Sequence, residues 1–309
     1  MNSERQPSSG GHPSRHGRTW GPVWVAAGAS LWGTDALLRR PLTSTLSSPQ
    51  IVLSEHLILT AVLLPTCWRA RGQWLGLGWL QWGAVLGIAW GGSALGTICF
   101  TEAIKIGNPT TAVFLQKTQP LFAALLARLL LKEPLGRRFW LVLAAAVLGA
   151  YFVSFGDRLR VPSLDSVQAP AAMLALAAAA LWGSSTVLGR FSLNSLSFST
   201  LTALRLITAT PFLLALAWSR PVPVVTSLDP RQAITLLLMA LLPGLAALLI
   251  YYKGLGQTRA SFAAVAELSF PATATLLNWV FLGAHVSLLQ AAGFALLWVV
   301  ILNLEKQPR

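Results

Sequence analysis

The chain has 309 residues, of which 54% are hydrophobic and only 11% are charged. This composition excludes an ordinary soluble domain, in which about 25% of residues are charged. The 23 lysines and arginines exceed the 10 acidic residues and give a net charge of +13, but they are scattered singly or in pairs. No basic cluster is available to bind nucleic acid. The sequence therefore predicts a polytopic helical protein whose apolar surface faces the lipid bilayer.

Residues 1–19 are polar and rich in Ser, Pro, Gly and Arg, and we expect them to form a disordered cytosolic tail. His12 and His16 stand four positions apart there, but Pro13 opposes the helix that would bring them together as metal ligands. Cys67 and Cys99 follow no metal or redox spacing. We therefore expect no metal site and no cofactor.

Beyond the tail, apolar stretches of about 20 residues recur, and each is long enough to cross the hydrocarbon core of a membrane. The loops between them are too short to hold an extramembrane domain. The predicted spans are 20–39, 49–68, 79–104, 109–131, 137–156, 168–189, 196–218, 232–256, 260–283 and 286–304. The sequence thus predicts an all-α integral membrane protein with ten transmembrane helices.

The two halves of the chain repeat each other. A shift of 150 positions places Trp32 on Trp182 and Glu55 on Arg205, and a shift of 151 places Gln116 on Glu267. The repeats, 20–156 and 168–304, then hold five spans each, and an odd number of spans inverts the second repeat relative to the first. Inverted repeats are typical of transporters, with the substrate site between the halves near the midplane.

Basic residues in the short loops predict the orientation in the membrane. If the N-terminus is cytoplasmic, more lysines and arginines fall on the cytoplasmic side, Arg137 and Arg138 among them. Arg39 and Arg40, which adjoin the first span on the other side, oppose this trend. We expect a protein of the plasma membrane with both termini in the cytoplasm, functional as a monomer.

Four motifs of the first half stand out: Phe100-Thr101-Glu102-Ala103, Asn108-Pro109-Thr110-Thr111-Ala112, Pro120 and Leu131-Lys132-Glu133-Pro134-Leu135. Together they resemble the repeat of EamA-type transporters of the drug/metabolite transporter superfamily, over about residues 20–304. The resemblance implies two inverted five-helix halves and a central cavity, lined mainly by the third, fourth, eighth and ninth spans with parts of the first and sixth. It also implies transport of small metabolites, often amino acid export. The second half departs from this pattern where Glu133 is matched by Ala284.

Charged groups inside a membrane need a partner or a wet cavity, so they mark candidate functional positions. We expect coupling or gating roles for Asp35, Glu55, Glu102, Arg205, Lys253 and Glu267. Inverted topology places the first three toward the outer side and the last three toward the inner side, so Glu55 and Arg205 should not touch. Lys117 is then the cation available to the outer acids. Glu267 is expected to pair with Arg205 or Lys253 and to close the inner side.

Polar and aromatic side chains near mid-span predict the lining of the cavity. Gln116, Lys117 and Gln119 precede Pro120, which removes a helix hydrogen bond, so one or two of them can instead bond freed backbone carbonyls. The repeat-related Trp32 and Trp182 can wall the cavity from opposite halves. The candidate substrate-binding residues are Trp32, Gln116, Lys117, Gln119, Trp182 and Tyr252.

These features predict a secondary transporter that moves a small polar or zwitterionic metabolite by alternating access, with amino acid export as the leading candidate. Without an ATP-binding motif it needs an ion or substrate gradient. We expect protons carried by Glu55 or Asp35, and favour Glu55, because burial disfavours a charged carboxylate. Substrate exchange, a channel and a lipid-handling protein are the alternatives. An enzyme is not expected, since the chain has no Walker loop, HExxH pair or nucleophile elbow.

Overall fold

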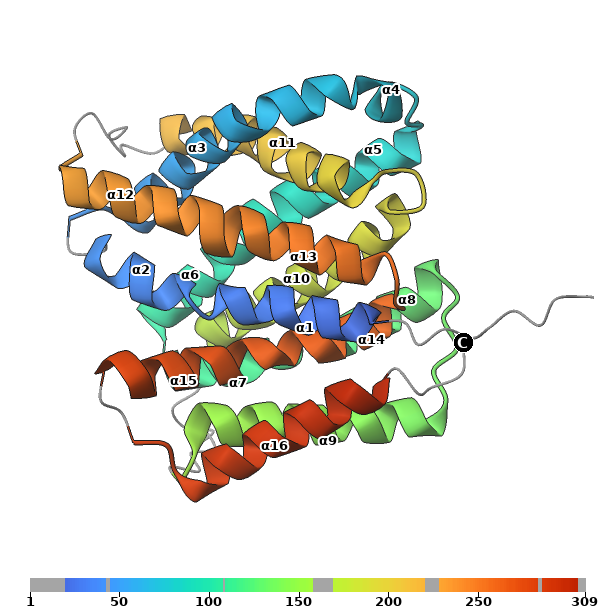
Figure 1. Cartoon of the computed structure of the whole chain (residues 1–309), viewed down its shortest axis with the longest axis vertical. Coiled ribbons are helices and arrows are strands. Elements are labelled where there is room, and N and C mark those ends of the chain that lie inside the picture. The colour runs from blue at the N-terminus through green and yellow to red at the C-terminus, as the bar shows by residue number, and fades with distance from the viewer. Residues whose placement is uncertain are drawn as a thin grey trace, which may run out of the picture.

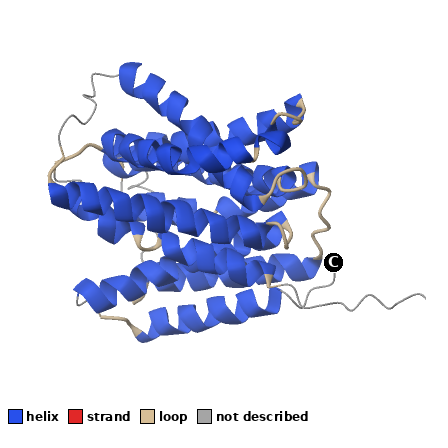
Figure 2. Ribbon diagram, turned by 45° about the horizontal axis from the view of Figure 1, so that its top comes forward, coloured by secondary structure: helices blue, strands red, loops and turns tan. Residues whose placement is uncertain are grey.

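The computed structural model describes residues 20–42, 45–107, 109–157, 169–219, 228–282 and 285–304. Secondary structure in these ranges is helical throughout, and Figure 2 shows helices joined by loops, with no strand in the described part of the chain. The all-helical class agrees with the prediction from sequence. The predicted tail, 1–19, and the segment 158–168 between the halves lie outside the described residues.

The helices follow one another along the chain as several long rods, some made of two or three consecutive elements. The first half contains α1 (Gly21–Trp32), α2 (Asp35–Leu42), α3 (Ser48–Arg69), α4 (Arg71–Trp74), α5 (Trp79–Leu86), the π-helix η1 (Gly87–Leu95), α6 (Gly96–Ile106), α7 (Pro109–Gln116), α8 (Gln119–Leu130) and α9 (Arg137–Phe155). The second half contains α10 (Ala169–Ser192), α11 (Phe198–Ser219), α12 (Pro230–Met239), the π-helix η3 (Ala240–Ala246), α13 (Ala247–Leu255), α14 (Ala260–Ala266), the 3₁₀ turn η4 (Glu267–Ser269), α15 (Phe270–Leu282) and α16 (Leu288–Leu304).

Within the described ranges, seven helical stretches are long and apolar enough to cross a membrane. They are Pro49–Arg69, Trp79–Ile106, Arg137–Phe155, Ala169–Ser192, Phe198–Ser219, Pro230–Leu255 and Ala260–Phe281. Large apolar side chains face outward from the bundle; Trp218 is 92% exposed and Leu288 87%. Lipid rather than water suits such a surface, so the chain is a multi-pass membrane protein.

The long helices lie side by side with their axes running across the page in Figure 1, so the bundle has two ends. The C-terminal end of α2 and the beginning of α12 lie at the left, and the C-terminal end of α8 and the beginning of α14 lie at the right (Figure 1). We call these the Leu42 end and the Leu130 end. If the protein spans a membrane along its helix axes, the two ends face opposite compartments.

Several helices are interrupted near the middle of their length. The chain turns at Gly33 and Thr34 between α1 and α2, so the predicted span 20–39 is interrupted within its length. It turns again at Lys117 and Thr118, just before Pro120, which lacks the N–H needed for a regular helix. The π-helices η1 and η3 and the turn η4 interrupt three further rods. By contrast, α10, which corresponds to α1 in the repeat, is continuous.

The helices of the two halves pack on each other in corresponding pairs. Helix α1 packs on α13 as α10 packs on α6, while α3 packs on α11 and α9 on α16. A Cβ atom at Gly28 would lie 2.7 Å from the carbonyl oxygen of Ala247, so α1 and α13 approach closely. Where α3 crosses α11, the hydroxyls of Thr60 and Thr210 are 2.8 Å apart, although the two residues are separated by 150 positions. The core thus lies between the halves.

Candidate functional site

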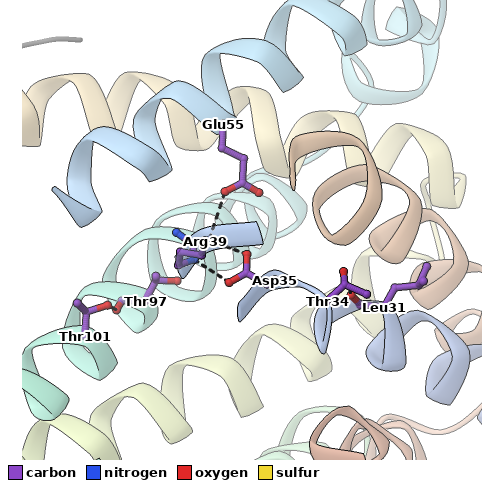
Figure 3. Close-up of polar contacts among 7 residues, drawn as sticks. All are labelled: Leu31, Thr34, Asp35, Arg39, Glu55, Thr97 and Thr101. Carbon is purple, nitrogen blue, oxygen red and sulfur yellow. Dashed lines mark hydrogen bonds and ion pairs between the residues drawn. The ribbon is translucent and has the colours of Figure 1, made fainter. Parts of the chain in front are cut away.

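A cluster of charged side chains lies toward the Leu42 end, where α2 passes α3 (Figure 3). Because α2 begins at Asp35, Arg39 follows one turn later, and its Nε and Nη2 donate to the two carboxylate oxygens of Asp35 at 2.7 and 2.8 Å. Nη2 also lies 3.7 Å from Oε2 of Glu55 on α3. We call these three residues the Arg39 cluster. Their side chains are 31% (Asp35), 27% (Arg39) and 12% (Glu55) exposed, so one guanidinium compensates two partly buried carboxylates.

The turn between α1 and α2 makes this arrangement possible. The Thr34 hydroxyl donates to the Leu31 carbonyl at 2.7 Å and so satisfies a carbonyl at the end of α1 (Figure 3). In the same view Thr101 of α6 donates to the Thr97 carbonyl at 2.8 Å within its own helix. The restart of the helix at Asp35 places Asp35 and Arg39 on one face of α2, at helical i, i+4 spacing.

The prediction that Lys117 compensates the outer acids is therefore wrong, because Arg39 has this role. Lys117 is only 4% exposed and lies in the turn between α7 and α8. Its ammonium is 5.4 Å from the centre of the Phe270 ring, a cation–π contact. Lys117 is thus buried as expected, but against α15 rather than beside Asp35 and Glu55.

Arg205 on α11 faces the π-helix η1. Its Nε donates to Ser93 Oγ at 2.8 Å and its Nη1 donates to the Tyr252 hydroxyl at 2.9 Å. Glu55, its repeat equivalent, lies beside the other π-helix: a Cβ atom at Gly244 of η3 would be 3.1 Å from Glu55 Oε1. The two residues thus face equivalent segments of opposite halves. They form no ion pair with each other in the described part of the chain, as the sequence predicts.

A second polar group surrounds Glu267 in η4, a carboxylate that is 9% exposed. Its Oε1 accepts hydrogen bonds from the hydroxyls of Tyr251 at 2.7 Å and Thr186 at 2.8 Å. Its Oε2 accepts one from Gln119 Nε2 at 2.6 Å, and Gln116 donates to Gln119 Oε1 at 3.1 Å. We call Glu267, Gln119, Thr186 and Tyr251 the Glu267 cluster. It joins α8, α10, α13 and η4, and every hydrogen-bond donor to the carboxylate is neutral.

The prediction that Glu267 pairs with Arg205 or Lys253 is wrong. Arg205 is bound by Ser93 and Tyr252, as described above. Lys253 lies near the end of α13 with an exposed side chain, and its ammonium is 4.4 Å from the centre of the Trp24 ring. The cation–π contact with Trp24 thus holds the Lys253 ammonium at the periphery of the bundle, away from Glu267.

Glu102 is also peripheral. It pairs with Lys105 one turn later at 3.3 Å, and the two side chains are 37% and 62% exposed. This pair lies at a small pocket between α3, α6 and α11, which has a volume of about 50 Å³ and is also lined by Val52, Thr97 and Leu213. Sites for small molecules usually measure about 300–1,000 Å³, so this pocket is too small for a metabolite.

Aromatic rings connect Arg205 with the Glu267 cluster. Trp32 packs on Tyr251 with ring centres 5.1 Å apart, and its repeat equivalent Trp182 packs on Phe100 at 5.3 Å. Each tryptophan thus contacts an aromatic residue of the opposite half, and Tyr251 and Phe100 are themselves repeat equivalents. The Tyr251 and Tyr252 rings are 5.3 Å apart. The two tyrosines therefore link the Glu267 cluster to Arg205.

Sequence reasoning missed Arg39, Thr186, Tyr251 and His56. Arg39 lies at the end of the first predicted span and counts there as a loop charge, although its i, i+4 spacing from Asp35 indicates a possible ion pair. Tyr251 and Thr186 carry no charge, so a search for charged groups within the spans does not single them out. His56, 6% exposed, has Nδ1 2.9 Å from the Val52 carbonyl, while its buried Nε2 has no hydrogen-bond partner in the described ranges. No group of His, Cys, Asp and Glu within these ranges could hold a metal ion.

A membrane bundle whose interrupted helices surround buried charges has the construction of a transporter. The sequence profile of the EamA-like transporter family matches residues 19–155 and, a second time, residues 169–304. The chain belongs to the EamA-like transporter family. This result confirms the resemblance that the motifs of the first half indicate.

Two relatives that each cover 93% of the chain agree with this assignment. The riboflavin transporter ImpX of Fusobacterium nucleatum is 31% identical over 294 residues, which are 93% of this chain and 97% of that protein. The uncharacterized transporter YwfM of Bacillus subtilis is 23% identical over 295 residues, 93% of this chain and 94% of that protein. A solved crystal structure with 20% identity shares the fold, with a TM-score of 0.74 over 94% of this chain and 99% of that chain. The chain is thus a transporter of a small molecule and not an enzyme.

Proposed function

We propose that the chain is a secondary transporter that works by alternating access, with ten transmembrane helices in two inverted repeats, 20–156 and 168–304. The family profile supports this arrangement because it matches twice, once in each half. The packing supports it because exchanging the halves converts the contact of α1 with α13 into that of α10 with α6. We further propose that the protein works as a monomer in the cell membrane with both termini in the cytoplasm.

The substrate site in this proposal lies between Arg205 and the Glu267 cluster. The observation that carries it is the interruption of the surrounding helices: η1, η3, η4 and the α7–α8 turn are irregular backbone at mid-length. Backbone of this kind at membrane depth marks the binding sites of transporters, and π-helical turns recur at functional sites. The contacts of the residues expected to bind substrate support this position. Gln119 donates to Glu267, Gln116 donates to Gln119, and Tyr252 accepts from Arg205. Trp32 packs on Tyr251, Trp182 donates to the Gly92 carbonyl of η1, and Lys117 contacts Phe270 next to η4.

The substrate we favour has a flat aromatic ring with polar edges, and riboflavin is the first candidate. Support comes from the aromatic pairs Trp32–Tyr251 and Trp182–Phe100, because such rings stack on flat heteroaromatic molecules. Further support comes from the 31% identical relative that is named a riboflavin transporter. A zwitterion such as an amino acid is the second candidate, because the guanidinium of Arg205 and the carboxylate of Glu267 carry opposite charges.

The Arg39 cluster is proposed to close the Leu42 end of the pathway. It joins α2 to α3, and both helices must separate if substrate passes between them. The neighbouring pocket of about 50 Å³ is too narrow for a metabolite, consistent with an arrangement that is closed on this side.

The test is uptake of radiolabelled riboflavin by proteoliposomes that contain the purified protein, with a panel of amino acids assayed in parallel. We expect saturable riboflavin uptake and counterflow, because a carrier binds substrate on each side in turn. Arg205→Met should strongly reduce uptake by removing the donors at the site, whereas Arg231→Gln, in the exposed first turn of α12, should not. Linear uptake without counterflow would indicate a channel. Uptake confined to amino acids would refute the aromatic substrate and favour the second candidate.

A further inference from the structure

The Glu267 cluster differs from the other carboxylate sites of the described residues in the kind of partner that it has. Asp35 and Glu55 share the cation Arg39, and Glu102 pairs with Lys105. Glu133 accepts hydrogen bonds from backbone N–H groups and a serine. Asp157 and Asp229 lie in exposed turns or loops. Glu267 alone among these is buried with two hydroxyl groups on one carboxylate oxygen and no cation within ion-pair distance.

We propose that Glu267 carries the proton that couples transport to a proton gradient. The proposal rests on the proposed function, namely that the chain is a secondary transporter. In the step itself, a proton from the water of one compartment binds a carboxylate oxygen of Glu267 and forms an O–H bond. After the site opens to the other compartment, this bond breaks and the proton is released to water there. No other reactant is needed.

The partners of Glu267 can serve both protonation states without rearranging the backbone. When the carboxylate is charged, the hydroxyls of Tyr251 and Thr186 donate to it at 2.7 and 2.8 Å. When it is protonated, its O–H can donate to either hydroxyl oxygen, because a hydroxyl both donates and accepts. The hydroxyl oxygens of Tyr251 and Thr186 are 3.1 Å apart, so the hydroxyl that accepts from protonated Glu267 can itself donate to the other hydroxyl.

The other buried carboxylates lack this freedom. Arg39 can only donate hydrogen bonds, so protonating Asp35 or Glu55 would remove an acceptor and leave the guanidinium less compensated in the membrane. Glu133 has one hydroxyl partner, Ser261, but each of its two oxygens also accepts from a backbone N–H, which is a donor only, whereas Oε1 of Glu267 is bound by hydroxyls alone. Glu55, the proton carrier that the sequence favours, is for this reason a gate residue in the proposal and Glu267 takes its place.

The charged groups around Glu267 link the proton to the substrate. From α11, Arg205 donates to the Tyr252 hydroxyl at 2.9 Å, and the Tyr252 ring lies 5.3 Å from that of Tyr251, which binds Glu267. A positive charge in the neighbourhood of a carboxylate favours its charged form. From the α7–α8 turn, Lys117 faces Phe270, which follows η4. The groups from α1, α8 and α10 are the neutral Trp32, Gln119 and Thr186. A substrate oxygen that accepts a hydrogen bond from Arg205 weakens the electrostatic effect of Arg205 on the Glu267 carboxylate. Substrate binding therefore promotes proton uptake by Glu267.

The first test reads protonation directly and needs no substrate. Infrared difference spectra of the purified protein, recorded as the pH is lowered, should contain the carbonyl band of a buried protonated carboxylic acid. This band should disappear in Glu267→Gln and remain in Glu55→Gln. If the band persists unchanged in Glu267→Gln, or if the wild type has none, Glu267 does not carry a proton.

The second test measures coupling with riboflavin in proteoliposomes. An imposed pH difference should drive accumulation by the wild type. Glu267→Gln should lose this accumulation, and any riboflavin exchange that remains should no longer respond to the pH difference. Glu267→Asp, which keeps the carboxylate, should recover part of the accumulation. Accumulation that persists in Glu267→Gln, or that follows a sodium gradient instead, overturns the proposal. If the wild type moves no riboflavin at all, the substrate assignment fails, and the infrared result still decides the role of Glu267.

Discussion

Arg39 joins two helices through one guanidinium group. Asp35 on its own helix binds it bidentately, and Glu55 on α3 lies 3.7 Å from Nη2. Without Arg39, the two carboxylates would remain in a partly buried region with no compensating cation, and each would also repel the other. The stability of this region therefore depends more on Arg39 than on either of the two acids.

We predict that Arg39→Met destabilises the protein by about 1–3 kcal/mol, below the cost of breaking a fully buried pair because the cluster is partly exposed. Glu55→Gln should cost less, since Arg39 keeps Asp35. The double variant should cost less than the sum of the two, because the second change removes a charge that the first left unpaired. Thermal unfolding in detergent measures all three. Strictly additive losses would show that Arg39 and Glu55 do not interact.

The sequence could identify the buried acids but, apart from the i, i+4 pair of Asp35 and Arg39, not their partners. Asp35, Glu55 and Glu267 are recognisable because charges are rare in apolar stretches. Their partners depend on the turn at Gly33 and Thr34, which shifts the direction of α2, and hydropathy contains no information on such a turn. The neutral partners Tyr251 and Thr186 were missed for another reason: in a membrane helix hydroxyl residues are common and often bond their own backbone.

At the scale of the elements, one contact ties the loop after α8 to the start of α14. The carboxylate of Glu133 accepts from the backbone N–H groups of Ala260 at 2.7 Å and Ser261 at 3.1 Å, and from the Ser261 hydroxyl at 2.6 Å. Lys132, with φ of 55°, adopts the left-handed conformation that turns the chain toward α14. The position that matches Glu133 in the second half is Ala284, which lies outside the described residues and has no carboxylate.

We predict that Glu133→Ala destabilises the protein by about 1–2 kcal/mol, because it removes a helix N-cap and leaves N–H groups at the start of α14 unsatisfied. Glu133→Gln keeps one carbonyl acceptor and should cost less. Glu102→Ala, at an exposed ion pair, is the matched control and should change stability little. The measurement is again thermal unfolding in detergent. Equal effects of Glu133→Ala and Glu102→Ala would refute a capping role.

The positions of the helical rods could be predicted well and their interruptions only partly. The long apolar stretches define where α3, α9, α10, α11 and α16 lie, because lipid requires apolar residues over a fixed length. Pro120 indicates the break between α7 and α8. The π-helices η1 and η3 could not be predicted. A π-helical turn shifts the backbone hydrogen bonds by one residue, and a uniformly apolar sequence contains no pattern that reveals this shift.

At the scale of the whole molecule, the orientation in the membrane can be tested. We predict that the Leu130 end faces the cytoplasm, because Arg137 and Arg138 lie there and basic loops stay inside. In a variant whose native cysteines are replaced, cysteine at Arg137 should resist an impermeant thiol reagent in intact cells. Cysteine at Asp157, an exposed residue of the opposite end, should react. The reverse pattern would invert the orientation, so that the Arg39 cluster would lie toward the cytoplasm.

The hydrogen bond between Thr60 and Thr210 limits which residues can occupy these two positions. Because the two positions are equivalent, the contact is isologous, as at the two-fold axis of a dimer of identical chains. A residue on such an axis contacts an identical residue, so it must be able to bind its own kind. A hydroxyl group can do this, because it both donates and accepts hydrogen bonds. A charge there would meet the same charge. Five positions earlier in each helix this restriction no longer applies, and the corresponding residues there carry opposite charges, Glu55 in one half and Arg205 in the other.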